Sequence, residues 1–239
     1  MRRFFVEDIR EDSLYAEIKG GELRHLNTVL RLRSGDAVVL FNGHGLEFEG
    51  NIESLGKNSA GVRVARRLGC LAESPVDITL LQGYVKGDKP EFVVQKATEL
   101  GVKDIVFYSA SRTVAKFMDE EKKISRLRKV SIEALKQSGR GFLPGISFMP
   151  FENAVKGWKD RLRLVLYEGE ERRHIKDLIK GRKAVVVMVG PEGGFSEDEV
   201  KEAGKEGFIP AGLGPRILRA ETAAVAVLSI IQYEMGDMG

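Results

Sequence analysis

The chain has 239 residues, of which 43% are hydrophobic and 31% charged, with a formal net charge of +3. This composition is typical of a folded globular protein, and no apolar run approaches the roughly 18 residues of a membrane span. A single cysteine, Cys70, excludes an internal disulfide framework and an all-cysteine metal site. No apolar stretch follows the N-terminal arginines, so we expect no signal peptide, no membrane and a cytoplasmic location.

The first 73 residues are predicted to form a small β-barrel. Strand signals occur in RRFFV, in LYAEI, which places Leu14, Ala16 and Ile18 on one side, and in the β-branched run DAVVLFN. Turn residues at 42–43 and 55–58 separate the later strands. One helix is expected among these strands, from the spacing of four apolar residues: Leu23, Leu26, Val29 and Leu30.

The pattern changes near residue 74, where we place a boundary between domains 1–73 and 74–239. Strand-like runs then alternate with helix-like ones, which favours an α/β domain with a mostly parallel sheet. The expected strands are 77–85, 104–110, 162–168, 184–190 and 208–214. The expected helices are 90–100, 120–138, 173–180, 197–206 and 220–235.

A glycine-rich loop follows the strand 184–190, in the sequence GPEGGFSEDEV. Glycines let the backbone approach a ligand closely, and Ser196 with Glu199 forms a capping box at the next helix. The loop lacks the G-x-x-x-x-G-K-[ST] pattern of an NTP-binding loop and the G-x-G-x-x-G pattern of a dinucleotide site. We therefore interpret it as a ligand loop of another kind.

A second glycine loop, Gly212-Leu213-Gly214-Pro215, precedes a long helix that is nearly uncharged from 223 to 231. Such a helix is expected to be buried on most sides. Charged residues nevertheless crowd its start, where burial without partners would be costly. This combination favours a site at the beginning of the helix.

The motifs GPEGGFS and LGPRILRAETA, with RRFFV, HLNTVLRLRSGD, KGDKPEFVVQKATELGV and EALKQSGR upstream, cover nearly the whole chain. Together they resemble the SPOUT superfamily of knotted methyltransferases, and within it the family that methylates N3 of a uridine in 16S ribosomal RNA. The resemblance implies an N-terminal PUA-like RNA-binding barrel and a C-terminal SPOUT domain with a trefoil knot. It also implies a homodimer that acts on the small ribosomal subunit.

The family's cofactor is S-adenosyl-L-methionine, held in a bent shape by three loops. Carried over motif by motif, the resemblance implies these cofactor-binding residues: Leu166, Glu168, Gly169, Val189, Gly190, Pro191, Glu192, Gly193, Gly194, Leu213, Gly214, Ile217, Leu218, Arg219, Thr222 and Ala223. Apolar side chains among them suit adenine, and the glycines permit close approach. The histidines His25, His44 and His174 show no metal spacing, so no metal is expected.

Uracil N3 carries a proton and is a poor nucleophile until that proton leaves, so the enzyme needs a base or a stabilising cation. Arg219 and Arg112 are candidates for the cation, and Glu221 for the base, although Glu221 is equally suited to the first turn of its helix. C5 methylation of pyrimidines generally needs a cysteine nucleophile. Because Cys70 lies near the end of the small domain, methylation at nitrogen or ribose oxygen is favoured over C5.

Basic segments suit a polyanionic partner, since phosphate neutralisation supplies most non-specific affinity. Residues 112–140 carry nine basic and four acidic side chains, whereas 1–74 are balanced, with eleven of each. The residues expected to contact RNA are Arg2, Arg3, Arg24, His25, Arg31, Arg33, Gln137, Ser138 and Arg140. Solvated helix faces would explain the same charges.

Two alternatives remain open. The protein could be a SPOUT methyltransferase that acts on another RNA atom, such as a ribose 2′-oxygen or a transfer-RNA base. It could also be an RNA-binding assembly factor that has lost catalysis. The intact loops GPEGG and RILRAET argue against that loss.

Overall fold

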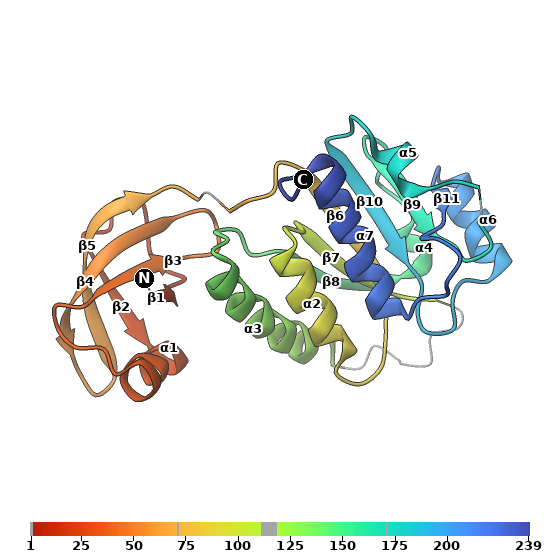
Figure 1. Cartoon of the computed structure of the whole chain (residues 1–239). Coiled ribbons are helices and arrows are strands. Elements are labelled where there is room, and N and C mark those ends of the chain that lie inside the picture. The colour runs from red at the N-terminus through yellow and green to blue at the C-terminus, as the bar shows by residue number, and fades with distance from the viewer. Residues whose placement is uncertain (1, 71, 111–118, 171) are drawn as a thin grey trace. The chain divides into compact units, whose positions relative to one another are not determined.

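The computed structural model describes residues 2–70, 72–110, 119–170 and 172–239, which divide into two compact units (Figure 1). The first unit is Met1–Glu73 with Leu135–Leu143, and the second is Ser74–Ala134 with Pro144–Gly239. Residues 135–143 follow the predicted boundary at 73 by some sixty positions in sequence, yet they pack with the first unit. A long-range contact of this kind leaves no local signal in the sequence.

The first unit contains a mixed five-stranded sheet of order β1-β3-β4-β5-β2. β1 pairs with β3 in parallel, and the other pairs are antiparallel. Its strands are β1 (Arg2–Phe5), β2 (Tyr15–Lys19), β3 (Ala37–Phe41), β4 (Glu47–Leu55) and β5 (Ser59–Leu68). The predicted barrel is observed as a curled mixed sheet, a half-barrel with β1 and β2 as its edges, and two register shifts between β4 and β5 bend it.

Alternating apolar residues of these strands build the core of the first unit. Phe4, Ile18, Leu40 and Val62 are fully buried there. Leu14, which the pattern placed beside Ala16 and Ile18, is instead 83% exposed. It precedes β2, where the backbone is not held in the period-two geometry that alternation assumes.

The helix expected at residues 23–30 has two parts. An α-helix, α1 (Gly20–Arg24), continues directly into a π-helix, η1 (His25–Leu30). Leu23 and Leu26 are buried as expected, but Val29 is 64% exposed. The wider turn of a π-helix shifts each later side chain around the axis, so the 3.6-residue period no longer predicts the buried face. Arg31 ends the segment in a left-handed conformation, with φ of 52°.

The second unit is built on a six-stranded sheet of order β11-β9-β10-β6-β7-β8, and all its pairs are parallel. The strands are β6 (Asp77–Gly83), β7 (Asp104–Ser109), β8 (Gly145–Pro150), β9 (Leu162–Leu166), β10 (Ala184–Val189) and β11 (Ile209–Ala211). The helices are α2 (Lys89–Glu99), α3 (Glu120–Ser138), α4 (Phe151–Ala154), α5 (Ile175–Ile179), α6 (Glu197–Lys205) and α7 (Ala220–Met235). The predicted parallel sheet is confirmed.

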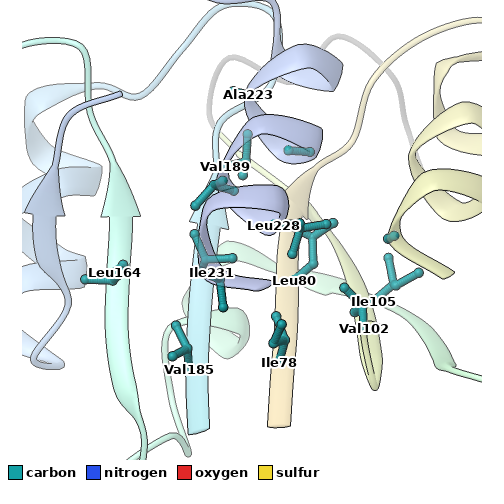
Figure 2. Packing of buried hydrophobic residues seen from close by; sticks show 14 of the residues in the cluster. Ile78, Leu80, Val102, Ile105, Leu164, Val185, Val189, Ala223, Leu228 and Ile231 are labelled. Atoms are coloured by element: carbon teal, nitrogen blue, oxygen red, sulfur yellow. The ribbon is translucent and has the colours of Figure 1, made fainter. Parts of the chain in front are cut away.

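Helices cover both faces of this sheet, because its strands are apolar on both sides. On one face, α2, α5 and α7 pack against residues such as Ile78, Leu80 and Val185. Figure 2 shows Leu228 and Ile231 of α7 on this face, and Ala223 next to Val189 at the end of β10. On the other face, α4 and α6 cover the intervening strand residues. Helix α7 is buried over most of its length, as its apolar sequence predicts.

The predicted helices agree with the observed ones to within two residues at each end, because the end signals are strong. Ser196 and Glu199 form the expected capping box. Asp88 does precede α2, but its side chain makes no capping hydrogen bond. Strand β8 and helix α4 were not predicted, since GISFMPFENA is short and carries no clear period. In the described part of the chain, no helix combines the length and apolar character needed to cross a bilayer.

Candidate methyl-donor pocket

Three loops leave the carboxyl ends of neighbouring strands in the second unit. They follow β9, β10 and β11, which all run in the same direction. In a parallel sheet these ends meet at one edge, where ligand sites of α/β proteins gather. The two glycine motifs and the segment after Leu166 are therefore brought to one edge of the sheet.

Backbone hydrogen bonds join the loop after β9 to the loop after β11. The Tyr167 N–H donates to the Ala211 carbonyl at 3.1 Å, and the Gly212 N–H donates to the Arg173 carbonyl at 3.0 Å. A Cβ at Gly212 would lie 2.3 Å from the Glu170 carbonyl oxygen. Glycine is required at 212 because the two backbones are too close for any side chain.

The loop after β10 forms a tight turn, in which the Gly194 N–H donates to the Pro191 carbonyl at 3.0 Å. Gly194 has φ of +68°, a conformation that favours glycine. The end of β6 approaches this turn so closely that a Cβ at Gly83 would lie 2.4 Å from the Pro191 nitrogen. The neighbouring strand therefore fixes where the turn begins.

The three loops and the start of α7 enclose a pocket of about 770 Å³. Its volume lies within the range of small-molecule sites. It is lined by Lys89, Leu166, Tyr167, Glu168, Glu170, His174, Val189, Gly190, Pro191, Glu192, Gly194, Phe195, Ala211, Gly212, Leu213, Gly214, Pro215, Arg216, Ile217, Leu218, Arg219, Ala220 and Ala223. A shallow hollow of similar size lies on α6 among acidic and lysine side chains, away from these loops.

Thirteen of the sixteen residues expected to bind the cofactor line this pocket. The other three, Gly169, Gly193 and Thr222, belong to the same segments but are not among the lining residues that the structure describes. Thr222 lies on the exposed side of α7. Several other lining residues were not predicted, among them Phe195, whose position directly after Gly194 would have indicated it.

Lys89 is the missed residue with the most informative contacts. Its Nζ lies 3.3 Å from Oε1 of Glu192 and 3.5 Å from Oε2 of Glu221. Burial raises the pKa of Glu192, but hydrogen bonds from the Lys86 N–H and from Lys89 outweigh burial, so that pKa lies below its usual value. Glu221, the candidate base, thus pairs with Lys89 and is not among the described lining residues.

Of the two arginines predicted to act in catalysis, Arg219 lies within the described residues. Arg219 lines the pocket, is exposed, and occupies the N-cap position of α7. Its carbonyl accepts the Ala223 N–H at 2.8 Å, which fixes its backbone at the start of the helix. Arg112 lies outside the described residues.

The arginines expected to bind RNA fall into two groups in the first unit, one exposed and one engaged in ion pairs. Arg2, Arg24, Arg31 and Arg33 are exposed, and His25 is half-buried. Arg24 ends α1, and Arg31 follows η1 directly. These exposed side chains are accessible to a polyanion in solution.

Arg3 and Arg140 are instead enclosed in ion pairs within the first unit. Arg3 pairs with Glu47, and its Nη2 donates to the Arg140 carbonyl at 2.8 Å. Arg140 is only 3% exposed and pairs with Glu73 at 3.0 Å. Arg3 thus joins the Arg140 backbone to β1, and Arg140 pairs with the segment after β5, so both guanidinium groups are engaged within the unit. That they contact RNA stays a prediction. Gln137 is exposed and Ser138 half-buried at the end of α3.

Comparisons with known proteins agree with this architecture. The family model for an RNA methyltransferase domain matches residues 72–232, and the model for an RNA methyltransferase PUA domain matches residues 18–64. The fold and these matches define an RNA methyltransferase that carries a PUA domain.

Individual relatives identify the family within this class of RNA methyltransferases. The ribosomal RNA small subunit methyltransferase E of Bacillus subtilis is 32% identical, over 98% of this chain and 97% of its own. The crystal structure of a protein of the same name from Neisseria gonorrhoeae, bound to S-adenosyl methionine, has a TM-score of 0.92 at 32% identity over 100% of both chains. A methyltransferase from Legionella pneumophila, in complex with the same cofactor, has a TM-score of 0.91 at 33% identity over 98% of both chains. The chain belongs to the ribosomal RNA small subunit methyltransferase E family.

Proposed function

We propose that this protein transfers the methyl group of S-adenosylmethionine to N3 of a uridine in the 16S ribosomal RNA of the small subunit. The observation that carries the proposal is the pocket itself, because three separate motifs of the chain converge on it. The two relatives described above bind S-adenosylmethionine with nearly the same fold. The specificity for N3 of uridine follows the family resemblance.

The residues of the pocket fit this cofactor. Leu166, Val189, Leu213 and Ala223 supply apolar wall for the adenine ring, and the glycine loops supply backbone groups for its polar edge. The carboxylate of Glu168 is available to the donor's cationic groups, whereas that of Glu192 is paired with Lys89. The proposed cofactor set is that expected from sequence: Leu166, Glu168, Gly169, Val189, Gly190, Pro191, Glu192, Gly193, Gly194, Leu213, Gly214, Ile217, Leu218, Arg219, Thr222 and Ala223.

When bound, S-adenosylmethionine supplies an electrophilic methyl group on a sulfonium. The protein must place uracil N3 in line with that group, which is mainly a matter of orientation. N3 must first give up its proton to a base or to water, which leaves a negative charge spread over the uracil ring and its carbonyl oxygens. That charge is neutralised when N3 takes up the methyl group and a neutral thioether leaves. Arg219, exposed at the pocket, is the proposed catalytic cation that stabilises this charge. We propose a second, similar role for Arg112.

Two features favour nitrogen over C5 as the methyl acceptor. C5 chemistry needs a free thiolate at the site, and Cys70 is not among the residues that line the pocket. Burial raises the pKa of the Cys70 thiol, whose Sγ donates to the Gly45 carbonyl at 3.3 Å. A neutral thiol is a poor nucleophile.

RNA binding is proposed for the exposed cations of the first unit, Arg2, Arg24, Arg31 and Arg33, with His25 beside them. In this proposal, residues 1–73 recognise the RNA and residues 74–239 carry out methyl transfer. Gln137 and Ser138 are proposed to lie near the substrate.

A homodimer in the cytoplasm is the proposed working form. Apolar side chains remain exposed on two helices that pack side by side: Phe92 on α2 is 43% exposed and Tyr233 on α7 is 64% exposed. Covering such groups with a second copy would remove them from water. Light scattering after gel filtration measures this directly, and a monomer at micromolar concentration would contradict the dimer.

The function is tested by incubating the protein with methyl-labelled S-adenosylmethionine and small ribosomal subunits that lack the modification. Mass spectrometry of the digested RNA is expected to show label in 3-methyluridine. Label in a 2′-O-methyl nucleoside would mean that the protein methylates a ribose oxygen instead of uridine N3. Label in transfer RNA only would mean that its substrate is not 16S ribosomal RNA. Donor binding without any transfer to RNA would instead favour an assembly factor.

A further inference from the structure

Lys89 is the first residue of α2 and also lines the pocket, yet neither glycine motif contains it. Its ammonium contacts Glu192 in the loop after β10 and Glu221 in the first turn of α7. One side chain from α2 therefore joins the two segments that carry the glycine motifs.

These ion pairs are partly shielded from water. The Glu221 side chain is 15% exposed, and its Oε2 is buried without a hydrogen bond among the described residues. The Lys89 side chain is 31% exposed. A buried carboxylate without a partner would be costly, so this contact is worth more than an ion pair on an open surface.

The charges of the cluster explain what the lysine does. Glu192 accepts hydrogen bonds from the Lys86 N–H at 3.0 Å and from Lys89 at 3.3 Å, which holds its carboxylate in one place. Both carboxylates lie against the same ammonium. Without that ammonium two like charges would face each other, and they would repel the loop from the helix.

We infer that Lys89 is a positioning residue for methyl transfer, which holds the 190–194 loop and the start of α7 at the separation that the methyl donor requires. It acts through the two carboxylates and not on the reacting atoms. Because Arg219 lies two residues before Glu221, the same contact also fixes the proposed catalytic cation relative to the donor. This inference rests on the proposed function and adds to it a residue outside the two glycine motifs.

The first test compares Lys89→Met, which keeps the length but removes the charge, with Lys89→Arg, which keeps the charge. Lys96→Met is the matched control, because Lys96 lies on the same helix and pairs with Glu99 at 2.9 Å, outside the pocket. Calorimetry with S-adenosylmethionine is expected to give a Kd raised about tenfold or more for Lys89→Met. Lys89→Arg is expected to recover most of that loss, and Lys96→Met to match the parent.

The second test is the double variant Lys89→Met/Glu221→Gln. Removing one of the two facing carboxylates relieves the repulsion, so the double variant is expected to bind the donor more tightly than Lys89→Met alone. A lysine that merely stabilised α2 would give no such recovery. The same variants are compared by kcat and KM, where the loss is expected in the KM for the donor.

Parent-like donor affinity in Lys89→Met would overturn the inference, as would a loss that neither Lys89→Arg nor the double variant recovers. The parent protein decides the proposed function separately. If the parent binds the donor but methylates no uridine in 16S ribosomal RNA, the function fails, and the affinity ratios of the variants still decide the role of Lys89.

Discussion

The hydroxyl group of Tyr108 donates a 2.8 Å hydrogen bond to the carbonyl oxygen of Val189. Tyr108 belongs to β7 and Val189 is the last residue of β10, with β6 lying between these strands. The bond spans the central strand and ends at the residue before the 190–194 loop. A fully buried side chain from outside the motifs thus fixes the point at which this loop leaves the sheet.

Tyr108→Phe is expected to destabilise the protein by about 1–3 kcal/mol, because the buried Val189 carbonyl loses its donor. Burial, reinforced by the charge of Glu199, raises the pKa of Tyr108 well above its ordinary value. The hydroxyl therefore remains a donor at neutral and mildly alkaline pH, and the destabilisation should be the same from pH 6 to pH 9, measured by urea unfolding. Tyr15→Phe, at an exposed tyrosine of the first unit, serves as the control. A Tyr108→Phe variant as stable as the parent would contradict the assigned role of the bond.

Arg219→Ala is expected to reduce single-turnover methylation by about 100-fold or more and to weaken donor binding far less than that. The guanidinium is proposed to stabilise the negative charge on the uracil. That charge does not exist when only the donor is bound. Calorimetry measures the affinity, and rapid-quench assays measure the turnover. Arg172→Ala, an exposed arginine outside the pocket, is the matched control. Unchanged single-turnover methylation in Arg219→Ala would remove Arg219 from catalysis.

Arg31→Ala combined with Arg33→Ala is expected to weaken RNA binding and to make it less dependent on salt. Each lost phosphate contact lowers the magnitude of the slope of log K against log salt by about 0.7 to 0.9, so two contacts should lower it by about 1.4 to 1.8. Arg63→Ala with Arg66→Ala is the control, because these exposed arginines already pair with Glu53 and Glu49. An unchanged slope in the Arg31 and Arg33 variant would exclude both residues from the RNA contact.

Asp77 should make part of the stability depend on pH. Burial raises the pKa of this carboxyl, but hydrogen bonds from Lys103 and Arg161 outweigh burial and bring the pKa below its usual 3.8. Because the folded-state pKa is lowered, this contribution is fully present above the unfolded-state pKa and is lost as pH falls through the folded-state value. Asp77→Asn should therefore cost about 2 kcal/mol at neutral pH.

The measurement for Asp77 is the free energy of unfolding as a function of pH. The difference between the parent and Asp77→Asn should stay constant near neutral pH and shrink below about pH 4. A difference that grew in acid would reverse the assigned direction of the pKa shift.

Local sequence determined most of the secondary structure of the second unit. Short apolar runs predicted the strands, and end signals such as the Ser196 capping box predicted the helices. Both kinds of signal depend on neighbours along the chain. The glycine loops were recognisable from their composition, and the structure gives the reasons: Gly194 has a positive φ, and the backbone of Glu170 leaves no room for a side chain at Gly212. The motifs also predicted thirteen of the pocket's lining residues.

Tertiary structure alone decided which segments meet. The order of strands, with β10 between β6 and β9, depends on long-range pairing that no local period encodes. The same holds for Lys89, which reaches two carboxylates more than one hundred positions away in sequence. Sequence also did not predict the burial of Arg140 beside Glu73, because an arginine is expected to be exposed unless a partner for its charge is known. The trefoil knot stays a prediction of the family resemblance. Sequence sets what each segment can form, and packing between distant segments sets what each side chain touches.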